Sequence, residues 1–231
     1  MSFTGATAPG TSIMNSEEAC EAIDRLLDHF EMKDFEGIGY DGSTPYQILI
    51  CTILSQQTTE RNCRIASQRL FAECPGPQEV YDTPSERIEE LVFSSGYYRQ
   101  KARCIKGVTA MIVEEFSGQV PDDPEDLMRL PGVGRKTAAC VMRYGFGKPS
   151  VIVDTHINRV SQRIGISCSK KPEDTQRAIT ETVPQDRWDD LDIAFITLGR
   201  TFCRPKDPDC DGCPVSDLCR FRNEYRNRSV F

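Results

Sequence analysis

The 231-residue chain lacks any apolar run that approaches the roughly 20 residues needed to span a membrane. Its first residues, MSFTGATAPGTSIMNSEEA, lack the basic and apolar regions of a secretory signal, and they also lack the arginines of an organelle presequence. Beyond this polar start there is no low-complexity segment and no internal repeat. We therefore expect neither a membrane-spanning, nor a secreted, nor a repeat protein. We expect an intracellular globular protein with a flexible tail over residues 1–14.

The chain also lacks the positive net charge that is typical of nucleic-acid-binding proteins, because its net charge is −7. This charge is unevenly distributed. Residues 1–127 have a net charge of −12, whereas residues 128–231 have a net charge of +5. A local basic face on an acidic body can still bind a polyanion, so the net charge does not exclude a nucleic-acid partner.

Cysteine, in contrast, is abundant, with eleven residues. Without a secretory signal a disulfide framework is not expected, and seven of the cysteines are scattered, most of them among apolar neighbours. The other four are separated by gaps of six, two and five residues in a loop rich in proline: Cys203, Cys210, Cys213 and Cys219. Four thiolates in one loop suit either a tetrahedral zinc ion or a four-iron four-sulfur cluster. The spacing predicts a metal site and leaves both metals open.

The pattern of apolar residues predicts an all-α fold. Apolar residues recur at helical spacing, and capping residues, proline or glycine stand at the expected ends. The expected helices cover residues 17–30, 46–57, 58–74, 85–93, 97–116, 125–130, 134–146, 158–165, 172–183 and 187–203. Only residues 151–153 look extended, and three residues do not make a sheet.

The segment LPGVGRKTA, residues 130–138, predicts a tight hairpin between two of these helices. Gly132 and Gly134 can adopt positive φ and let another backbone approach closely. The free amides at the start of the next helix form an anion site suited to phosphate, and a phosphate contact carries no base-sequence information. An ordinary helix–helix turn explains the same pentapeptide, so the glycines alone are weak evidence.

Two further residues are candidates for chemistry. Lys136 lies in the first turn of the helix after the hairpin, where a lysine is either a solvated charge or a nucleophile. Asp154 opens the segment DTHINRVSQRIG, where it is a helix N-cap or a carboxylate that stabilises developing positive charge. Both roles of Asp154 can coexist. His156 is expected to pack or to form hydrogen bonds rather than to transfer protons.

Together these motifs closely resemble the endonuclease III family of helix-hairpin-helix DNA glycosylases. LPGVGRKTA resembles its hairpin with the catalytic lysine, VDTH its catalytic aspartate segment, and the final cysteine spacing its iron–sulfur loop. LSQQTTE at 54–60 and SGYYRQKA at 95–102 extend the resemblance, which covers about residues 20–220. The order and the intervals of three independent motifs agree.

The resemblance implies a two-domain, all-α helix-hairpin-helix glycosylase fold. A six-helix barrel would span residues 38–148 and contain the helix-hairpin-helix at about 126–146. An iron–sulfur cluster domain would combine residues 15–37 with 149–231, and DNA would bind in the cleft between the two domains. The metal would be a 4Fe-4S cluster held by the four cysteines of the final loop.

The resemblance also implies the DNA-binding residues. Gln57 would fill the space that an extruded base leaves, and Gly132, Val133 and Gly134 would hold the DNA backbone. Arg204 and Lys206 would contact phosphate, although Asp207 and Asp209 partly offset their charge. Tyr97 stands where the best-known bacterial members have an aliphatic residue that wedges into the strand opposite the lesion.

The implied function is base-excision repair by a bifunctional DNA glycosylase and AP lyase. Lys136 would attack the sugar, form a Schiff base and cut the strand by β-elimination, with Asp154 as the second catalytic residue. Related adenine and mismatch enzymes generally lack this lysine, which favours oxidised pyrimidines as substrates. The alternatives are a thymine or uracil mismatch glycosylase and a non-catalytic iron–sulfur DNA-binding module. We expect a monomer in the cytoplasm or nucleoid that binds damaged double-stranded DNA and no membrane.

Overall fold

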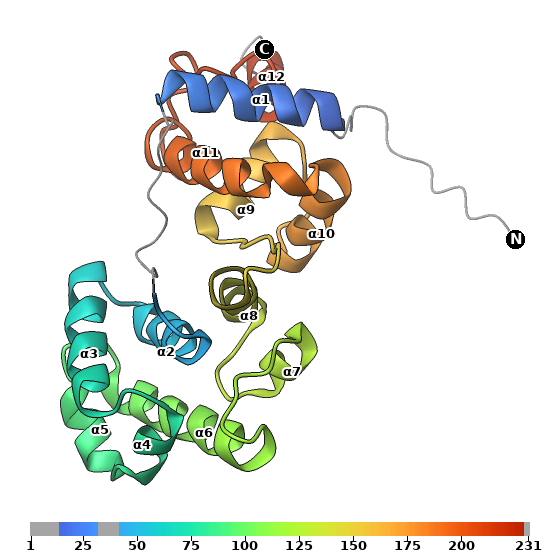
Figure 1. Cartoon of the computed structure of the whole chain (residues 1–231). Coiled ribbons are helices and arrows are strands. Elements are labelled where there is room, and N and C mark those ends of the chain that lie inside the picture. Colours follow the sequence, from blue (N-terminus) through green and yellow to red (C-terminus); the bar gives the residue numbers. More distant parts are fainter. Residues whose placement is uncertain (1–13, 32–41, 229–231) are drawn as a thin grey trace, which may run out of the picture. The chain divides into compact units, whose positions relative to one another are not determined.

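The computed structural model describes residues 14–31 and 42–228, and these residues form helices joined by loops, without a β-strand (Figure 1). The all-α expectation is confirmed. The helices are α1 (Ser16–His29), α2 (Pro45–Ser55), α3 (Glu60–Glu73), α4 (Pro77–Asp82), α5 (Ser85–Leu91), α6 (Tyr98–Glu115), α7 (Pro124–Arg129), α8 (Arg135–Cys140), the π-helix η1 (Val141–Gly145), α9 (Thr155–Ile164), α10 (Pro172–Thr182), the 3-10 helix η2 (Gln185–Arg187), α11 (Trp188–Arg200) and α12 (Arg220–Arg228).

Local sequence signals explain where the first helices begin. Asn15 caps α1 through a capping box, in which its side chain accepts from the amide of Glu18 and the Glu18 carboxylate accepts from the Asn15 amide. Thr44 caps α2 in the same way with Gln47, and a proline occupies the first position of that helix. The apolar helix α2 is buried on nearly all sides, as a central core helix must be.

The chain divides into two compact units, and each has its own core. One unit comprises Met1–Phe35 with Val151–Phe231, and the other comprises Glu36–Ser150. In the first unit α1 packs against α11, although the two are far apart in the sequence. In the second unit α2 packs against α3, α6, α8 and η1. The identification of these units with a six-helix barrel and a cluster domain stays a prediction.

The structure differs from the expected helix boundaries at several places. Helix α3 begins two residues late, α5 ends two residues early, α9 begins three residues early and α11 ends three residues early. Helix α2 ends at Ser55, two residues early, because Gln57 has a positive φ of 49° that no helix accommodates. Helices α4 and α12 were not expected. The expected helix 134–146 ends in the wider π turn η1. The six-residue α4 is too short to show a helical period.

The expected tail covers residues 1–14. Residues 1–13 lie outside the described part, but Met14 is buried and its amide donates to the Gly165 carbonyl.

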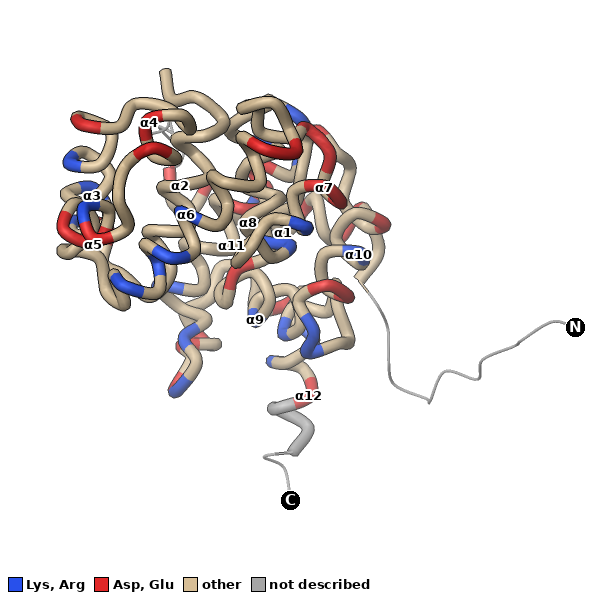
Figure 2. The backbone as a smooth tube through the Cα atoms, turned by 90° about the horizontal axis from the view of Figure 1, so that it is seen from below, with Lys and Arg blue, Asp and Glu red and all other residues tan. Residues whose placement is uncertain are grey.

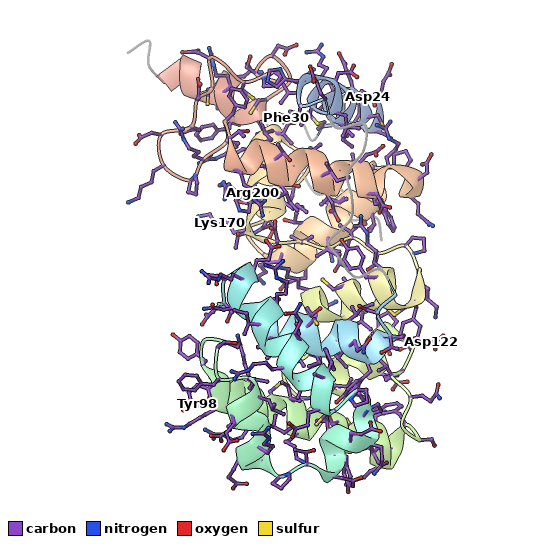
Figure 3. All side chains as sticks on the ribbon, turned by 60° about the vertical axis from the view of Figure 1, so that its left-hand side comes forward. Asp24, Phe30, Tyr98, Asp122, Lys170 and Arg200 are labelled. Atoms are coloured by element: carbon purple, nitrogen blue, oxygen red, sulfur yellow. The ribbon has the colours of Figure 1, made fainter. Side chains whose placement is uncertain are left out.

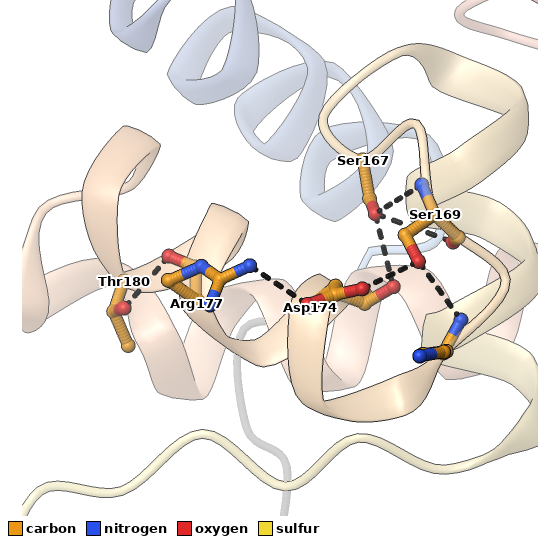
Figure 4. A network of polar contacts seen from close by, with 7 residues as sticks. Ser167, Ser169, Asp174, Arg177 and Thr180 are labelled. Atoms are coloured by element: carbon orange, nitrogen blue, oxygen red, sulfur yellow. Dashed lines mark hydrogen bonds and ion pairs between the residues drawn. The ribbon is translucent and has the colours of Figure 1, made fainter.

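Short polar contacts fix the loop between α9 and α10 in the first unit (Figure 4). The Ser169 hydroxyl donates to Asp174 at 2.7 Å, and Arg177 donates to the other oxygen of the same carboxylate at 2.7 Å. These contacts, with the Ser169 hydrogen bond as the main cause, lower the pKa of Asp174. In the same loop the Ser167 hydroxyl accepts from Thr175 at 3.1 Å, so α10 is held at its first turn.

The short helices α4, α5 and α7 each contain acidic residues, which are coloured red on the backbone in Figure 2. These helices belong to the acidic portion of the sequence and are unsuited to contact with phosphate. Within the described ranges no helix is long and apolar enough to cross a membrane.

Candidate functional site

The hairpin lies between α7 and α8, and one of its glycines is obligatory. Gly132 has a φ of +72°, and a Cβ atom there would lie 2.4 Å from the Cys104 sulfur of α6. The Cys104 thiol also donates to the Pro131 carbonyl at 3.1 Å. Any side chain at position 132 would therefore push the hairpin away from α6.

At Gly134 the structure differs from the positive φ that the sequence predicts. It is the N-cap of α8 with φ −96° and ψ 179°, which is extended backbone, so the predicted positive φ is wrong at this residue. The space beside it is open, because nothing lies within 4 Å of an added Cβ atom. The side chain of Val133 points inward and is buried in the core. Only the backbone of Val133 is available to a ligand.

Lys136 is the second residue of α8 and is exposed. The residues that follow it, Thr137 to Cys140, are all buried and fix this end of the helix in the core. The amine is therefore carried on a rigid element directly after the hairpin.

Gln57 and Tyr97 lie on two loops of the same unit that contact each other. Both side chains are exposed, and both residues have a left-handed backbone, with φ of 49° and 57°. A residue with a Cβ atom in this region costs about 1–2 kcal/mol. Such strain is typical of ligand-binding loops. The structure therefore brings these two candidate DNA-binding residues together.

The two neighbouring tyrosines behave differently. Tyr97 is 68% exposed and does not pack into the core. Tyr98, labelled in Figure 3, packs against the core, and its ring lies 4.9 Å from that of Phe93. Inward packing thus applies to Tyr98 alone, and Tyr97 is free to contact a ligand.

Asp154 is the N-cap of α9. Its Oδ1 atom accepts from the amides of His156 and Ile157, both at 2.8 Å. Within the described ranges its Oδ2 atom has no hydrogen-bond partner. Capping therefore occupies one oxygen and leaves the other for chemistry. Asp154 and Lys136 belong to different units. His156 has a packing role, with its Nδ1 atom 3.2 Å from Arg159.

Helix α9 also holds the cysteine loop, through two arginines that the sequence motifs did not indicate. Arg159 donates to the carbonyl of Cys203 at 3.0 Å, and Arg163 donates to that of Arg204 at 2.7 Å. Arg163 also lies 3.4 Å from the Cys203 sulfur. The four-residue spacing of the two arginines was the available signal, because it places both on one face of a helix.

The four cysteines of the final loop surround one pocket. Its lining includes Cys203, Cys210, Cys213 and Cys219. Val160, Leu198, Phe202 and Arg222 also line it. All four cysteines are free thiols. Burial raises the pKa of Cys213 to about 11, so its thiol is protonated at neutral pH until a metal displaces the proton.

The arrangement of the four thiols bears on whether this pocket holds a single metal ion or an iron–sulfur cluster. Among the described residues no three His, Cys, Asp or Glu side chains form a site for one metal ion. A cluster makes a different demand, because each thiolate binds a different iron and the four thiols need only surround it. Arg222, which is 8% exposed, has a buried Nη1 atom without a partner in the described part of the chain. An anionic centre with four thiolates, whether a zinc ion or a cluster, would supply that missing acceptor, and the spread of the four thiols around the pocket favours the larger cluster.

Arg204 and Lys206 are both exposed in this loop. The Arg204 guanidinium donates to the backbone carbonyl of Asp207, at 3.0 Å from Nη2. Asp209 accepts from the amide of Gly212 at 3.0 Å. In the described part of the chain, neither Arg204 nor Lys206 forms an ion pair with Asp207 or Asp209. The two aspartates therefore do not offset the positive charge of these residues through direct ion pairs.

Comparison with known proteins places these features in a family. Residues 50–185 match the family model described as HhH-GPD superfamily base excision DNA repair protein. The chain is 40% identical over 190 residues to an endonuclease III of Thermotoga maritima, covering 80% of this chain and 89% of that protein. It is 33% identical over 210 residues to an endonuclease III of Bacillus subtilis, covering 90% and 94% of the two chains.

Solved structures show the same similarity. A trapped endonuclease III–DNA covalent intermediate, an estranged-adenine complex, matches with a TM-score of 0.79 and 32% identity, covering 93% of this chain and 100% of that chain. A thermostable thymine-DNA glycosylase matches with a TM-score of 0.76 and 23% identity, covering 90% and 98%. At that identity the second similarity concerns the fold alone.

Proposed function

Since this chain belongs to the endonuclease III family of HhH-GPD base excision DNA repair proteins, it is a DNA glycosylase and AP lyase, and we propose that it removes oxidised pyrimidines from duplex DNA. The observation that carries the proposal is Lys136, an exposed amine at the second position of α8, directly after the hairpin. A glycosylase without a lyase step does not need an amine there.

The proposed reaction begins when the damaged base is extruded from the stack. The neutral amine of Lys136 attacks C1′ of the sugar, and the bond from C1′ to the base nitrogen breaks, so the base leaves with the electron pair and takes up a proton. Opening of the sugar ring gives a Schiff base between Nζ and C1′. Loss of a proton from C2′ then expels the 3′ phosphate, which cuts the strand by β-elimination.

Asp154 stabilises the positive charge that develops on the sugar as the base departs. Its Oδ1 atom is held by two backbone amides, which fixes the position of the carboxylate without using Oδ2. Gly132 and Gly134 let the DNA backbone approach the amides of α8, and Gln57 and Tyr97 occupy the opened duplex. Arg204 and Lys206 contact phosphate. The enzyme acts on DNA as a monomer in the cytoplasm or nucleoid.

A substrate panel tests the proposal. Borohydride trapping with duplexes that contain thymine glycol, uracil or guanine-paired thymine should give a covalent product chiefly with thymine glycol. Preferential action on guanine-paired thymine would support the mismatch glycosylase instead, which the shared fold does not exclude. Binding of damaged duplexes without release of any base would support a non-catalytic module.

The pocket of the final loop supports a 4Fe-4S cluster held by Cys203, Cys210, Cys213 and Cys219. When bound, the cluster would tie the parts of the loop that carry the four cysteines to one another by ligation, and base removal would not pass through it. The support comes from the four thiols around one pocket and from the unpaired Nη1 atom of Arg222 beside them.

Anaerobically purified protein is expected to be yellow-brown, with the four iron atoms of one cluster per chain. Cys213→Ala should lose iron and soluble yield together, because the loop has few apolar residues to fold it without metal. Iron analysis and the visible absorption spectrum measure both effects. Cys168→Ala, which removes an exposed cysteine outside the loop, should keep full iron. Stoichiometric zinc without iron in the parent protein would overturn the cluster assignment.

Tyr97→Ala is expected to slow base excision from duplex DNA at least several-fold. Stacking of an aromatic ring on a base contributes roughly 1–3 kcal/mol, which corresponds to about five- to 150-fold. Single-turnover excision from duplex DNA measures the loss, and strand cleavage at a preformed abasic site in single-stranded DNA should change little. Phe93→Ala, which removes a ring that is 63% exposed on the same segment, is the matched control. Equal losses on both substrates would mean that Tyr97 supports the fold or the pocket.

A further inference from the structure

The two loops that carry Gln57 and Tyr97 are joined by direct contacts. The Gly96 amide donates to the Thr58 hydroxyl at 3.1 Å, and the Ser95 hydroxyl donates to the Leu54 carbonyl at 3.2 Å. A Cβ atom at Gly96 would lie 3.1 Å from the Gln57 carbonyl oxygen. The backbone and side chains of the two loops are therefore packed directly against each other.

A buried lysine lies at the junction of these loops. Lys101, at the end of the first turn of α6, is only 5% exposed. Its Nζ atom donates to the Leu54 carbonyl at 2.7 Å, to the Thr58 hydroxyl at 2.6 Å and to the Ser95 hydroxyl at 2.8 Å. One ammonium group thus uses its three protons to bind both loops.

A charged ammonium group at this buried position costs free energy of desolvation. All three acceptors are neutral, and no carboxylate pairs with Lys101 in the described part of the chain. Burial lowers the pKa of the ammonium, because the charged form loses hydration in a buried position. An apolar side chain would fill the same space without that cost. The lysine is therefore better explained by what it positions than by stability.

Lys101 lies beside two residues with strained backbones. Gln57 and Tyr97 both have left-handed backbones, one in each of the two loops that Lys101 contacts. Strained conformations of this kind persist only where the surrounding structure determines them. The hydrogen bonds of Lys101 to Leu54, Thr58 and Ser95 surround both positions and supply that constraint.

We infer that Lys101 is a positioning residue that locks the two loops into one preformed clamp for the opened duplex. The inference rests on the proposed function, since it takes Gln57 and Tyr97 as the residues that enter the duplex. A clamp ordered before DNA arrives does not have to be ordered on binding, so its loss should weaken the engagement of duplex DNA. Chemistry at a sugar that is already exposed does not need the clamp.

The experiment compares Lys101→Met with Lys106→Met. Lys106 is a lysine of the same helix whose Nζ atom also donates to three oxygens, at 2.7 to 3.1 Å, but these are the carbonyls of Val80, Tyr81 and Thr83 at the end of α4. For a duplex with thymine glycol, KM should rise roughly tenfold in Lys101→Met, since small misplacements of positioning groups have large effects. The kcat on single-stranded DNA with a preformed abasic site should stay within about twofold in both variants.

Thr58→Val provides a second variant in case Lys101→Met folds poorly. It keeps the lysine but removes the hydroxyl that accepts from both Lys101 and Gly96, and it should also raise KM for the duplex selectively. Equal losses on both substrates in the Lys101 and Thr58 variants, or a similar duplex defect in Lys106→Met, would overturn the inference. If the parent protein cleaves neither substrate, the proposed function itself fails, and that result is distinct.

Discussion

Lys136→Ala is expected to abolish covalent trapping by borohydride, with a loss of strand cleavage on the order of 10³-fold or more, because the variant has no nucleophile. Duplex binding should remain largely intact, since the hairpin backbone and the buried side chains after Lys136 do not depend on the amine. Trapping gels measure the first effect, and binding to a duplex with an uncleavable abasic analogue measures the second.

The control for this prediction is Lys136→Arg, which keeps a positive charge but cannot form the Schiff base. It should be as inactive in trapping as the alanine variant. Lys170→Ala, which removes an exposed lysine of the other unit, should be trapped like the parent protein. If trapping is undiminished in Lys136→Ala, another amine forms the intermediate and the assignment of Lys136 is wrong.

Asp154→Asn is expected to slow base excision on the order of 10²–10³-fold, because the neutral amide no longer stabilises the positive sugar. The melting temperature should change little. Asparagine caps helices about as well as aspartate, and its oxygen can accept from His156 and Ile157 as Oδ1 does now. Single-turnover excision and thermal unfolding separate the two roles of this residue.

The matched control is Asp123→Asn, because Asp123 caps α7 with the same pattern of hydrogen bonds. Its carboxylate accepts from the amides of Glu125 at 2.8 Å and of Asp126 at 3.2 Å. This variant should retain both stability and excision. Should Asp154→Asn lose stability while each folded molecule still turns over normally, N-capping is the only role of Asp154.

The sequence alone was enough to predict features that depend on near neighbours in the chain. The start of α1, one residue before the expected position 17, follows from a capping residue at Asn15, and the turn at Gly132 follows from a residue without a Cβ atom. The N-cap position of Asp154 and the loop with four cysteines were also apparent from spacing. The family was recognisable for the same reason, since its motifs are short and their intervals are constant.

Tertiary structure decided the features that depend on residues far apart in the chain. Whether Val133 points inward, whether Tyr97 rather than Tyr98 is exposed, and where α2 ends are all set by packing against other helices. Lys101 is the clearest case: in the sequence it is an ordinary helical lysine. Its role depends on Leu54, Thr58 and Ser95, which come to it from two other segments, and no local pattern records such contacts.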